Sequence, residues 1–127
     1  MNDSIPTQPG APFEGGIYAG VTRGDDDQPA GHLILLPDVS DKTLNWADAV
    51  KWAESLGDGA RLPTRFESAM LYANLRDQLD PSAWDWTSTQ FSEHYAFYQD
   101  FYHGYQGHRG KKFEGRVRAV RLIQLTP

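Results

Sequence analysis

Two helix-like patterns follow each other in the middle of the chain, with strand-like sequence on both sides. The first has its apolar residues at helical spacing and precedes Gly57, a residue type that commonly follows a last helical turn; its stripe consists of Trp46, Ala49, Val50, Ala53 and Leu56. The second opens with Thr64 and Glu67 at the spacing of a capping box, so we expect a helix that begins at Arg65. Pro81 ends this pattern, whose predicted apolar face consists of Phe66, Ala69, Met70, Ala73 and Leu75.

Strand patterns occupy both flanks of the helical region. Before it, residues 13–24 begin a glycine-rich strand, and residues 31–37 form an apolar strand that Pro37 is expected to close. After it, two segments alternate large and small side chains, a glycine-broken connection follows, and the chain returns as a last strand; these are residues 84–90, 94–101, 102–110 and 111–125. This order predicts an α+β domain over residues 13–127, preceded by a flexible arm or tether over residues 1–12.

Length and composition set further limits. A chain of 127 residues fits one domain that buries its own core. It contains no cysteine, which excludes disulfides, thiolate zinc sites and cysteine nucleophiles. The first residues lack the basic and apolar regions of a signal peptide, and no apolar run approaches the ~20 residues of a membrane span. We therefore expect no membrane insertion.

The charge of the chain is unevenly distributed. The formal net charge is −5, yet half of the lysines and arginines lie between Arg109 and Arg121, where Glu114 is the only acid. Such a strip can release counterions from nucleic-acid phosphates. The sequence pI of about 5.2 opposes attraction to a polyanion, however, so we do not expect nucleic acid as a partner.

A family resemblance covers nearly the whole chain. In order, the chain contains GGIYAG, HLILLP, NWADAVKWAESLG, RLPTRFE, WDWTSTQ, YAFYQDF and EGRVRAVR. From Phe13 to about Leu122 it resembles the Lcl C-terminal-like domain family, much of which comes from phages and bacteria. The resemblance implies a C-type lectin-like fold, related to the formylglycine-generating enzyme group and to variable receptor-binding proteins of phages. In this fold two helices flank a twisted antiparallel sheet, and the N- and C-terminal strands pair.

Departures from these relatives narrow what the resemblance implies. The formylglycine-generating oxidases use cysteines, which this chain lacks, so that activity is not expected. The motifs of calcium-dependent sugar-binding lectins are missing, and WTS at residues 86–88 replaces the polar ligands of one of them. The resemblance gives the arginines of residues 116–121 a stabilising role, in which Arg118 pairs with Asp85 or Glu93.

An aromatic-rich stretch begins within the second of the late strand patterns and continues past its end. Six of the sixteen aromatic residues lie between Tyr95 and Tyr105. Strand alternation gives them two faces, and the resemblance implies core positions for Phe97 and Phe101, which leaves the other face outward. Tyrosine and arginine are favoured at binding hot spots. We expect a ligand-binding surface made of Tyr98, Asp100, Tyr102, His103, Tyr105, His108 and Arg109.

A competing interpretation is that these rings pair across strands and serve only the fold. The rings continue into the glycine-containing turn, where sheet pairing does not explain them, and this favours a binding surface. The alternative stays open at the level of the sequence.

Metal binding and catalysis find less support. The acids of residues 25–27 are consecutive and cannot all converge on one calcium ion. The spacing of His103 and His108 does not match a zinc pattern. Ser88 and Ser92 are near His94 in sequence, but neither lies in the elbow motif that positions a serine nucleophile. We expect no metal, no cofactor and no enzyme activity.

The sequence thus predicts a non-catalytic binding module of phage or prophage origin that recognises a protein or a glycan. Its arm would attach it to a larger phage assembly, and a homo-oligomer is compatible with the sequence. One alternative is a small intracellular phage factor that binds and inhibits or modulates a host protein. A second is an enzyme with an unrecognised site, which would show a cleft lined by carboxylates and histidines of perturbed pKa. The location stays open between the virion and the host cytoplasm.

Overall fold

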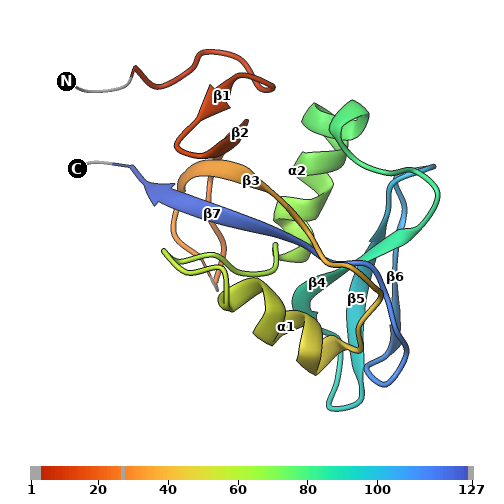
Figure 1. Cartoon of the computed structure of the whole chain (residues 1–127). Coiled ribbons are helices and arrows are strands. Elements are labelled where there is room, and N and C mark those ends of the chain that lie inside the picture. The colour runs from red at the N-terminus through yellow and green to blue at the C-terminus, as the bar shows by residue number, and fades with distance from the viewer. Residues whose placement is uncertain (1–3, 27, 126–127) are drawn as a thin grey trace.

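A computed structural model describes residues 4–26 and 28–125 of the chain, which form two antiparallel sheets and two α-helices (Figure 1). The elements are β1 Pro12–Phe13, β2 Gly16–Thr22, β3 Gly31–Val39, α1 Trp46–Glu54, α2 Arg65–Leu75, the short 3₁₀ helix η1 Arg76–Gln78, β4 Trp84–Gln90, β5 Tyr95–Asp100, β6 Gln106–Gly110 and β7 Arg118–Gln124. Strands thus lie both before and after the helices in the chain. The predicted α+β class is confirmed.

The larger sheet joins the two ends of the chain. Its order is β1-β2-β3-β7, and β3 pairs with β7 through the register Leu33↔Leu122. The predicted pairing of N- and C-terminal strands is therefore confirmed. Pro37 does not close β3 as expected, because the strand continues to Val39. The register shifts between Leu35 and Val39, and such an irregularity accommodates a residue that has no N–H for the ladder.

The expected arm over residues 1–12 meets the larger sheet at its end. Gly10 N donates to Tyr18 O at 2.8 Å, and Pro12 pairs with Ile17 of β2. Residues 1–3 lie outside the described part of the chain. The boundary at residue 12 and the tethering role of the arm stay predictions.

Helix α1 follows the sequence pattern closely. Asn45 caps its first turn, since the side-chain oxygen accepts a hydrogen bond from Asp48 N at 2.9 Å. The helix buries Ala49 and Ala53 completely, and Gly57 follows the helix end with a φ of 82°. The apolar stripe of this helix was correctly predicted.

Helix α2 begins where the capping box predicts, but it buries a different face. Thr64 N donates to the Glu67 carboxylate at 2.9 Å, and Glu67 N donates to the Thr64 hydroxyl at 3.1 Å. The predicted apolar face is wrong except at Leu75, because Phe66 is 63% exposed and Ala69 and Ala73 are also exposed. The buried face instead consists of Glu67, Ser68, Leu71 and Leu75.

An ion pair explains this difference. The Arg61 guanidinium donates to both carboxylate oxygens of Glu67, at 2.7 and 2.9 Å. A buried carboxylate that is paired and capped in this way no longer carries the full cost of its desolvation. The polar side of α2 can therefore face inward, and Phe66 is left on the surface.

The smaller sheet has the order β4-β5-β6 and lies at the other end of the molecule from β1 (Figure 1). Residues 102–110 were expected to form a connection only, and this is wrong for Gln106–Gly110, which pair with β5 from Gln99↔Gln106 to Tyr95↔Gly110. The last strand starts at Arg118, later than expected. Before it, Gly115 makes an isolated bridge with Leu44.

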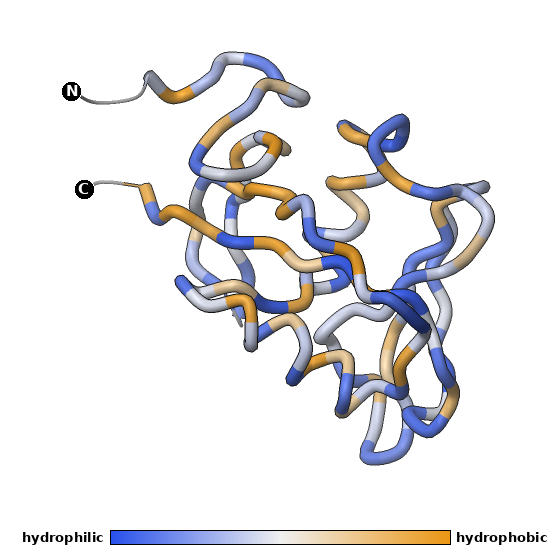
Figure 2. The backbone as a smooth tube through the Cα atoms, viewed as in Figure 1, coloured by the Kyte–Doolittle hydropathy of each residue, from blue (hydrophilic) through white to orange (hydrophobic). Residues whose placement is uncertain are grey.

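The core divides into two clusters on either side of the larger sheet. Ile34 belongs to the cluster beneath α1, whereas Leu33 and Leu35 belong to the cluster beneath α2. Figure 2 shows hydrophobic segments along β3 and β7. Val117 and Val120 are buried as well, at 1% and 0% exposure. In the described part of the chain, neither helix is long and apolar enough to cross a membrane.

Candidate functional site

The register of the smaller sheet gives it two faces that both carry rings. Tyr98 pairs with Gly107 and with Trp86, whereas Phe97 pairs with His108. Successive side chains point to opposite faces, so Tyr98 and Phe97 lie on different sides of the sheet. The predicted alternation along β5 is therefore correct, but the face expected to point outward also packs on the core, because Ala96 is 0% exposed and belongs to the cluster beneath α1. The site has to be described one face at a time.

The first face is called the Trp84 face and consists of Trp84, Tyr98, Tyr105, Arg109 and Phe113. The ring centroids of Trp84 and Tyr98 are 5.1 Å apart, and those of Tyr98 and Tyr105 are 6.3 Å apart. The guanidinium carbon of Arg109 lies 5.1 Å from the Trp84 centroid and 5.8 Å from that of Phe113. These distances are those of cation–π contacts.

Arg109 has spare hydrogen-bonding capacity. Its side chain is exposed, and within residues 4–26 and 28–125 no carboxylate lies within 4.0 Å of its guanidinium. A guanidinium carries five N–H donors in a planar fork that suits carboxylate and phosphate groups. The rings hold Arg109 in place while its donors stay available to a ligand.

Tyr98 contributes to the fold as well as to this face. Its ring lies over Gly107, where a Cβ atom would come within 2.8 Å of the Tyr98 hydroxyl oxygen. The side chain is half-buried against the cluster beneath α1. Burial, the largest cause, raises the pKa of Tyr98 above its ordinary value. Tyr98 is thus the floor of the Trp84 face, and Tyr105, at 55% exposure, stands above it.

The second face is called the His108 face and consists of Phe91, Tyr95, Phe97, His108 and Arg65. The Phe91 and His108 rings are stacked with centroids 3.9 Å apart and planes 7° apart. Arg65 lies 3.8 Å above the Phe97 ring and donates to the Gln106 side chain at 3.0 Å. Phe97 was expected in the core, but it is only half-buried beneath Arg65. Phe101, the other predicted core ring, is 4% exposed.

The turn between β5 and β6 is held by directional hydrogen bonds. The Gln99 side-chain amide donates to Asp100 O at 2.8 Å and to Gly104 O at 3.0 Å. The Asp100 carboxylate accepts from His103 N at 2.6 Å. This leaves Tyr102 at the tip with 67% exposure. Asp100 therefore shapes the turn, and Tyr102 and His103 are displayed by it.

The seven predicted site residues consequently fall into three groups. Tyr98, Tyr105 and Arg109 lie together on the Trp84 face. Asp100, Tyr102 and His103 form the turn, and His108 lies on the opposite face. Sequence reasoning missed Trp84, Phe91 and Arg65. Trp84 and Phe91 come from β4 and the residue after it, and their contacts with Arg109 and His108 require β4 and β6 to lie on either side of β5. Arg65 comes from α2, far away in the chain.

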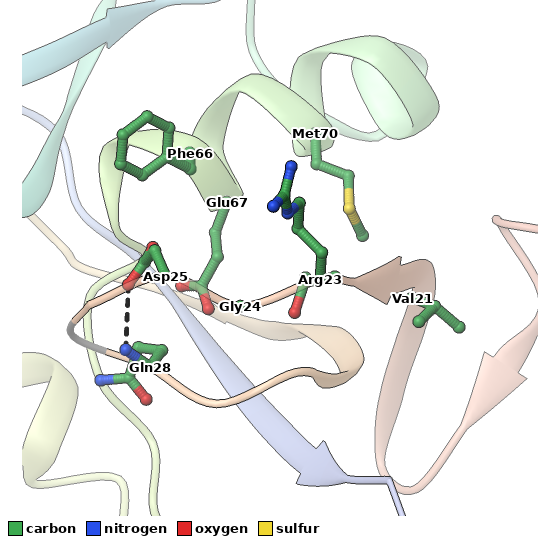
Figure 3. Close-up of a pocket in the computed structure, with 9 residues that line it drawn as sticks. Val21, Arg23, Gly24, Asp25, Gln28, Phe66, Glu67 and Met70 are labelled. Atoms are coloured by element: carbon green, nitrogen blue, oxygen red, sulfur yellow. Dashed lines mark hydrogen bonds between the residues drawn. The ribbon is translucent and has the colours of Figure 1, made fainter.

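One hollow adjoins the two faces, and another lies on α2. One, of about 520 Å³, lies at the end of β6 and is lined by Glu93, His94, Tyr95, Lys111, Lys112 and Phe113. The other, of about 380 Å³, lies between the end of β2 and α2; there Phe66, Met70 and Val21 provide an apolar wall beside Arg23 (Figure 3). At its rim Gln28 N donates to the Asp25 carboxylate at 2.9 Å (Figure 3). The sequence did not suggest this second hollow, because Phe66 was assigned to the core.

A charge cluster surrounds one buried carboxyl of β4, that of Asp85. Burial, partly offset by attraction to Arg116 and Arg118, raises the pKa of Asp85 to about 7. Arg116 itself pairs with Asp80 at 2.6 Å, and Arg118 donates to Leu36 O at 3.1 Å. Of the two predicted partners of Arg118, Asp85 is the one whose charge acts on it. Glu93 lies on the surface.

The catalytic and metal-binding groups considered in the sequence are not assembled within the described residues. His94 is exposed beside Glu93, and within the described ranges no hydrogen bond joins it to Ser88 or Ser92. Among the same residues no group of three or more histidine, aspartate or glutamate side chains is placed to hold a metal ion. Asp27, one of the three consecutive acids, lies outside the described residues. The geometry supports contact with a ligand, through rings and one available guanidinium.

Comparison with known proteins bears on the fold. No protein-family model and no curated protein matches the chain. Among solved structures it is similar to EMS16, a C-type lectin-like snake venom protein and an antagonist of the collagen receptor integrin α2β1. The match has a TM-score of 0.53 and 14% sequence identity, and it covers 82% of this chain and 98% of the EMS16 chain. The chain therefore has a C-type lectin-like fold.

Proposed function

We propose that the chain is a non-catalytic binding module that recognises a protein or a glycan through the Trp84 face and the turn beside it. The observation that carries this proposal is Arg109, held among the rings of the Trp84 face with no carboxylate of the described residues to occupy it. Tyrosine and arginine at an exposed, well-supported position are the residue types that dominate binding hot spots.

The rigidity of the surface supports the same proposal. Gln99 fixes the turn from below, and Tyr98 and Trp84 pack against the core. Side chains that are already ordered lose less conformational entropy when a ligand arrives. EMS16 is an antagonist of an integrin, so a protein with a similar fold acts on another protein. That supports a protein ligand.

Origin and attachment are further parts of the proposal. The ordered segments that resemble the Lcl C-terminal-like domain family support membership of that family and a phage or prophage origin. In such a setting the residues before Pro12 would connect the module to a fibre or to another subunit. Immunogold labelling of virions produced by a host that encodes the chain would test this part separately.

The binding proposal is tested with ligand arrays. Wild-type protein and the variant Tyr105→Ala/Arg109→Ala are applied to a glycan array and to an array of folded host proteins. Both side chains are exposed, so the variant is expected to fold. We expect at least one ligand that the wild type retains and the variant loses.

The matched control is Phe66→Ala, which removes a 63% exposed ring from α2 and not from the smaller sheet. It should retain every ligand of the wild type. Equal retention by the wild type and the double variant would show that the Trp84 face is not a binding surface.

A further inference from the structure

The smaller sheet has an open edge at β6, the last strand in the order β4-β5-β6 (Figure 1). Ladder bonds from Asp100 N to Tyr105 O at 2.9 Å and from Lys111 N to His94 O at 2.8 Å fix which backbone groups point toward β5. In an antiparallel pair these groups alternate along the strand. The residues whose N–H and C=O groups point away from β5 are therefore Gln106, His108 and Gly110.

Each of the other edges is covered in part. On β7, Val120 exchanges backbone hydrogen bonds with Arg61 at 2.8 and 3.0 Å. On β4, Trp86 N donates to Arg116 O at 3.0 Å. The edge strand β1 is only two residues long. Along β6, by contrast, the outward groups of Gln106 and His108 have no hydrogen-bond partner in the described part of the chain. Such a row of free groups is a template for another strand.

Side chains on both sides of β6 can receive the side chains of an added strand. Gly107 has no side chain of its own, so a residue opposite it would contact the Tyr98 ring that lies there. Residues on the other face would meet the stacked rings of His108 and Phe91. Main-chain bonds along an edge and alternate side-chain contacts are the two components of recognition by strand addition.

Local charge selects the kind of strand. The chain has a net charge of −5, but basic side chains outnumber acidic ones around β6. Arg65, Arg109, Lys111 and Lys112 lie there, against Glu93 in the hollow and Asp100 in the turn. A residue opposite Arg109 would meet its available guanidinium, and an acidic residue there could pair with both donor branches. A second copy of β6 would bring equal charges together at the same place, which opposes self-pairing.

Resting on the proposed function, we propose that β6 accepts an extended, acidic segment of a partner protein as an additional strand. The backbone of the segment bonds to Gln106 and His108, and its acidic residues face Arg109. The hollow at the end of β6 receives the next side chain near Lys111 and Lys112. This assigns a partner class and a binding mode to the surface.

The test uses a short peptide of alternating valine and glutamate, titrated into the ¹⁵N-labelled full chain and followed by NMR. We expect saturable shifts that are largest at the backbone amides of Gln106, His108 and Gly110. A peptide of alternating valine and lysine, or the first peptide methylated on alternate backbone nitrogens, should bind at least about tenfold more weakly. If either control peptide binds as tightly as the valine–glutamate peptide, strand addition is overturned. The absence of shifts with the valine–glutamate peptide also overturns it.

Variants of the protein sharpen the result. Arg109→Gln should weaken the acidic peptide about tenfold, while Lys42→Gln, an equal charge change at an exposed residue away from β6, should not. Concentration-dependent shifts of the β6 amides without peptide would show self-pairing and overturn the proposal. If heparin shifts residues of the Trp84 face and the acidic peptide shifts no amide of the β6 edge, strand addition is overturned too. In that case the array experiment would still support the binding function.

Discussion

The two sheets of this molecule are built from different kinds of residue. In the larger sheet, consecutive aliphatic residues of β3 are buried on both faces, with Leu33 and Ile34 at 0% exposure. In the smaller sheet, Gln99 and Thr87 are as deeply buried, and many of the rings are only half-buried. The larger sheet gains stability from apolar burial. The smaller sheet depends on directional bonds and leaves its rings available at the surface.

Side-chain hydrogen bonds attach the smaller sheet to the rest of the fold. Trp86 Nε1 donates to Leu44 O at 3.0 Å, and Trp46 Nε1 donates to Thr87 O at 2.9 Å. Gln106 donates to Gln99 at 2.7 Å and to Arg65 O at 2.6 Å. Such bonds fix orientation, whereas apolar contacts alone tolerate sliding. A surface that must present rings in one arrangement benefits from this construction.

The largest expected effect is that of truncating the aliphatic strand. Leu33→Ala removes a fully buried side chain and leaves a cavity, so the free energy of unfolding should fall by about 2–5 kcal/mol. Val21→Ala, at a 53% exposed position of the neighbouring strand, should change it by less than about 0.5 kcal/mol. Urea denaturation of both variants measures the contrast. Similar losses would mean that the larger sheet does not carry the stability of the fold.

The buried carboxyl of Asp85 should make stability depend on pH. Its pKa in the folded protein is about 7, above the ordinary value that it regains on unfolding. Between these two values the folded state binds the proton more tightly than the unfolded state does. The contribution of Asp85 to the free energy of unfolding is therefore favourable in acid and is lost as the pH rises through about 7. We expect the free energy of unfolding to decrease between about pH 4 and about pH 7 for this reason.

Asp85→Asn should flatten this part of the pH profile, because an amide cannot ionise. Denaturation at several pH values measures the slope, and Asp41→Asn, at an exposed position, is the matched control and should keep the wild-type slope. An unchanged slope in Asp85→Asn would mean that this carboxyl stays ionised in the folded protein. The charges of Arg116 and Arg118 would then outweigh its burial.

A smaller effect is expected from the polar support of the turn. Gln99→Leu keeps the size of the side chain but leaves the carbonyl groups of Asp100 and Gly104 without their donor, which should cost about 1–3 kcal/mol. Amide exchange in residues 101–105 should accelerate more than exchange in β3. Gln124→Leu, at an exposed position of β7, should show neither change. Uniform acceleration across both sheets would contradict the local role of Gln99.

The helix starts and most strands could be predicted from local sequence, because the relevant contacts are local. The capping box of Thr64 and Glu67 lies within one turn, and the alternation of β5 needs only neighbouring residues. The buried face of α2 could not be predicted in this way. It depends on Arg61, whose partner role becomes visible only when the loop before the helix is folded.

The candidate surface was predictable in part for the same reason. Tyr98, Tyr105 and Arg109 come from adjacent strands joined by one turn, so their meeting follows from a hairpin. His108 was grouped with them because the strand character of residues 106–110 was missed, and with it the alternation that turns His108 to the other face. Trp84 lies in β4 of the same sheet, but its contact with Arg109 depends on β4 and β6 lying on either side of β5. Arg65 reaches the sheet from α2, a segment that sequence spacing does not connect to it.

The smallest expected effect concerns the exposed ring that the Trp84 face presents. Tyr105→Ala removes a 55% exposed side chain, so the free energy of unfolding should change by less than about 0.5 kcal/mol. Tyr98→Ala should cost several times more, because that ring packs on the core and fills the space above Gly107. Thermal denaturation of the two variants compares them directly. A loss for Tyr105→Ala as large as that for Tyr98→Ala would mean that Tyr105 stabilises the fold. The smaller sheet would then not present this ring to a ligand, and the proposed difference between the two sheets would be wrong for Tyr105.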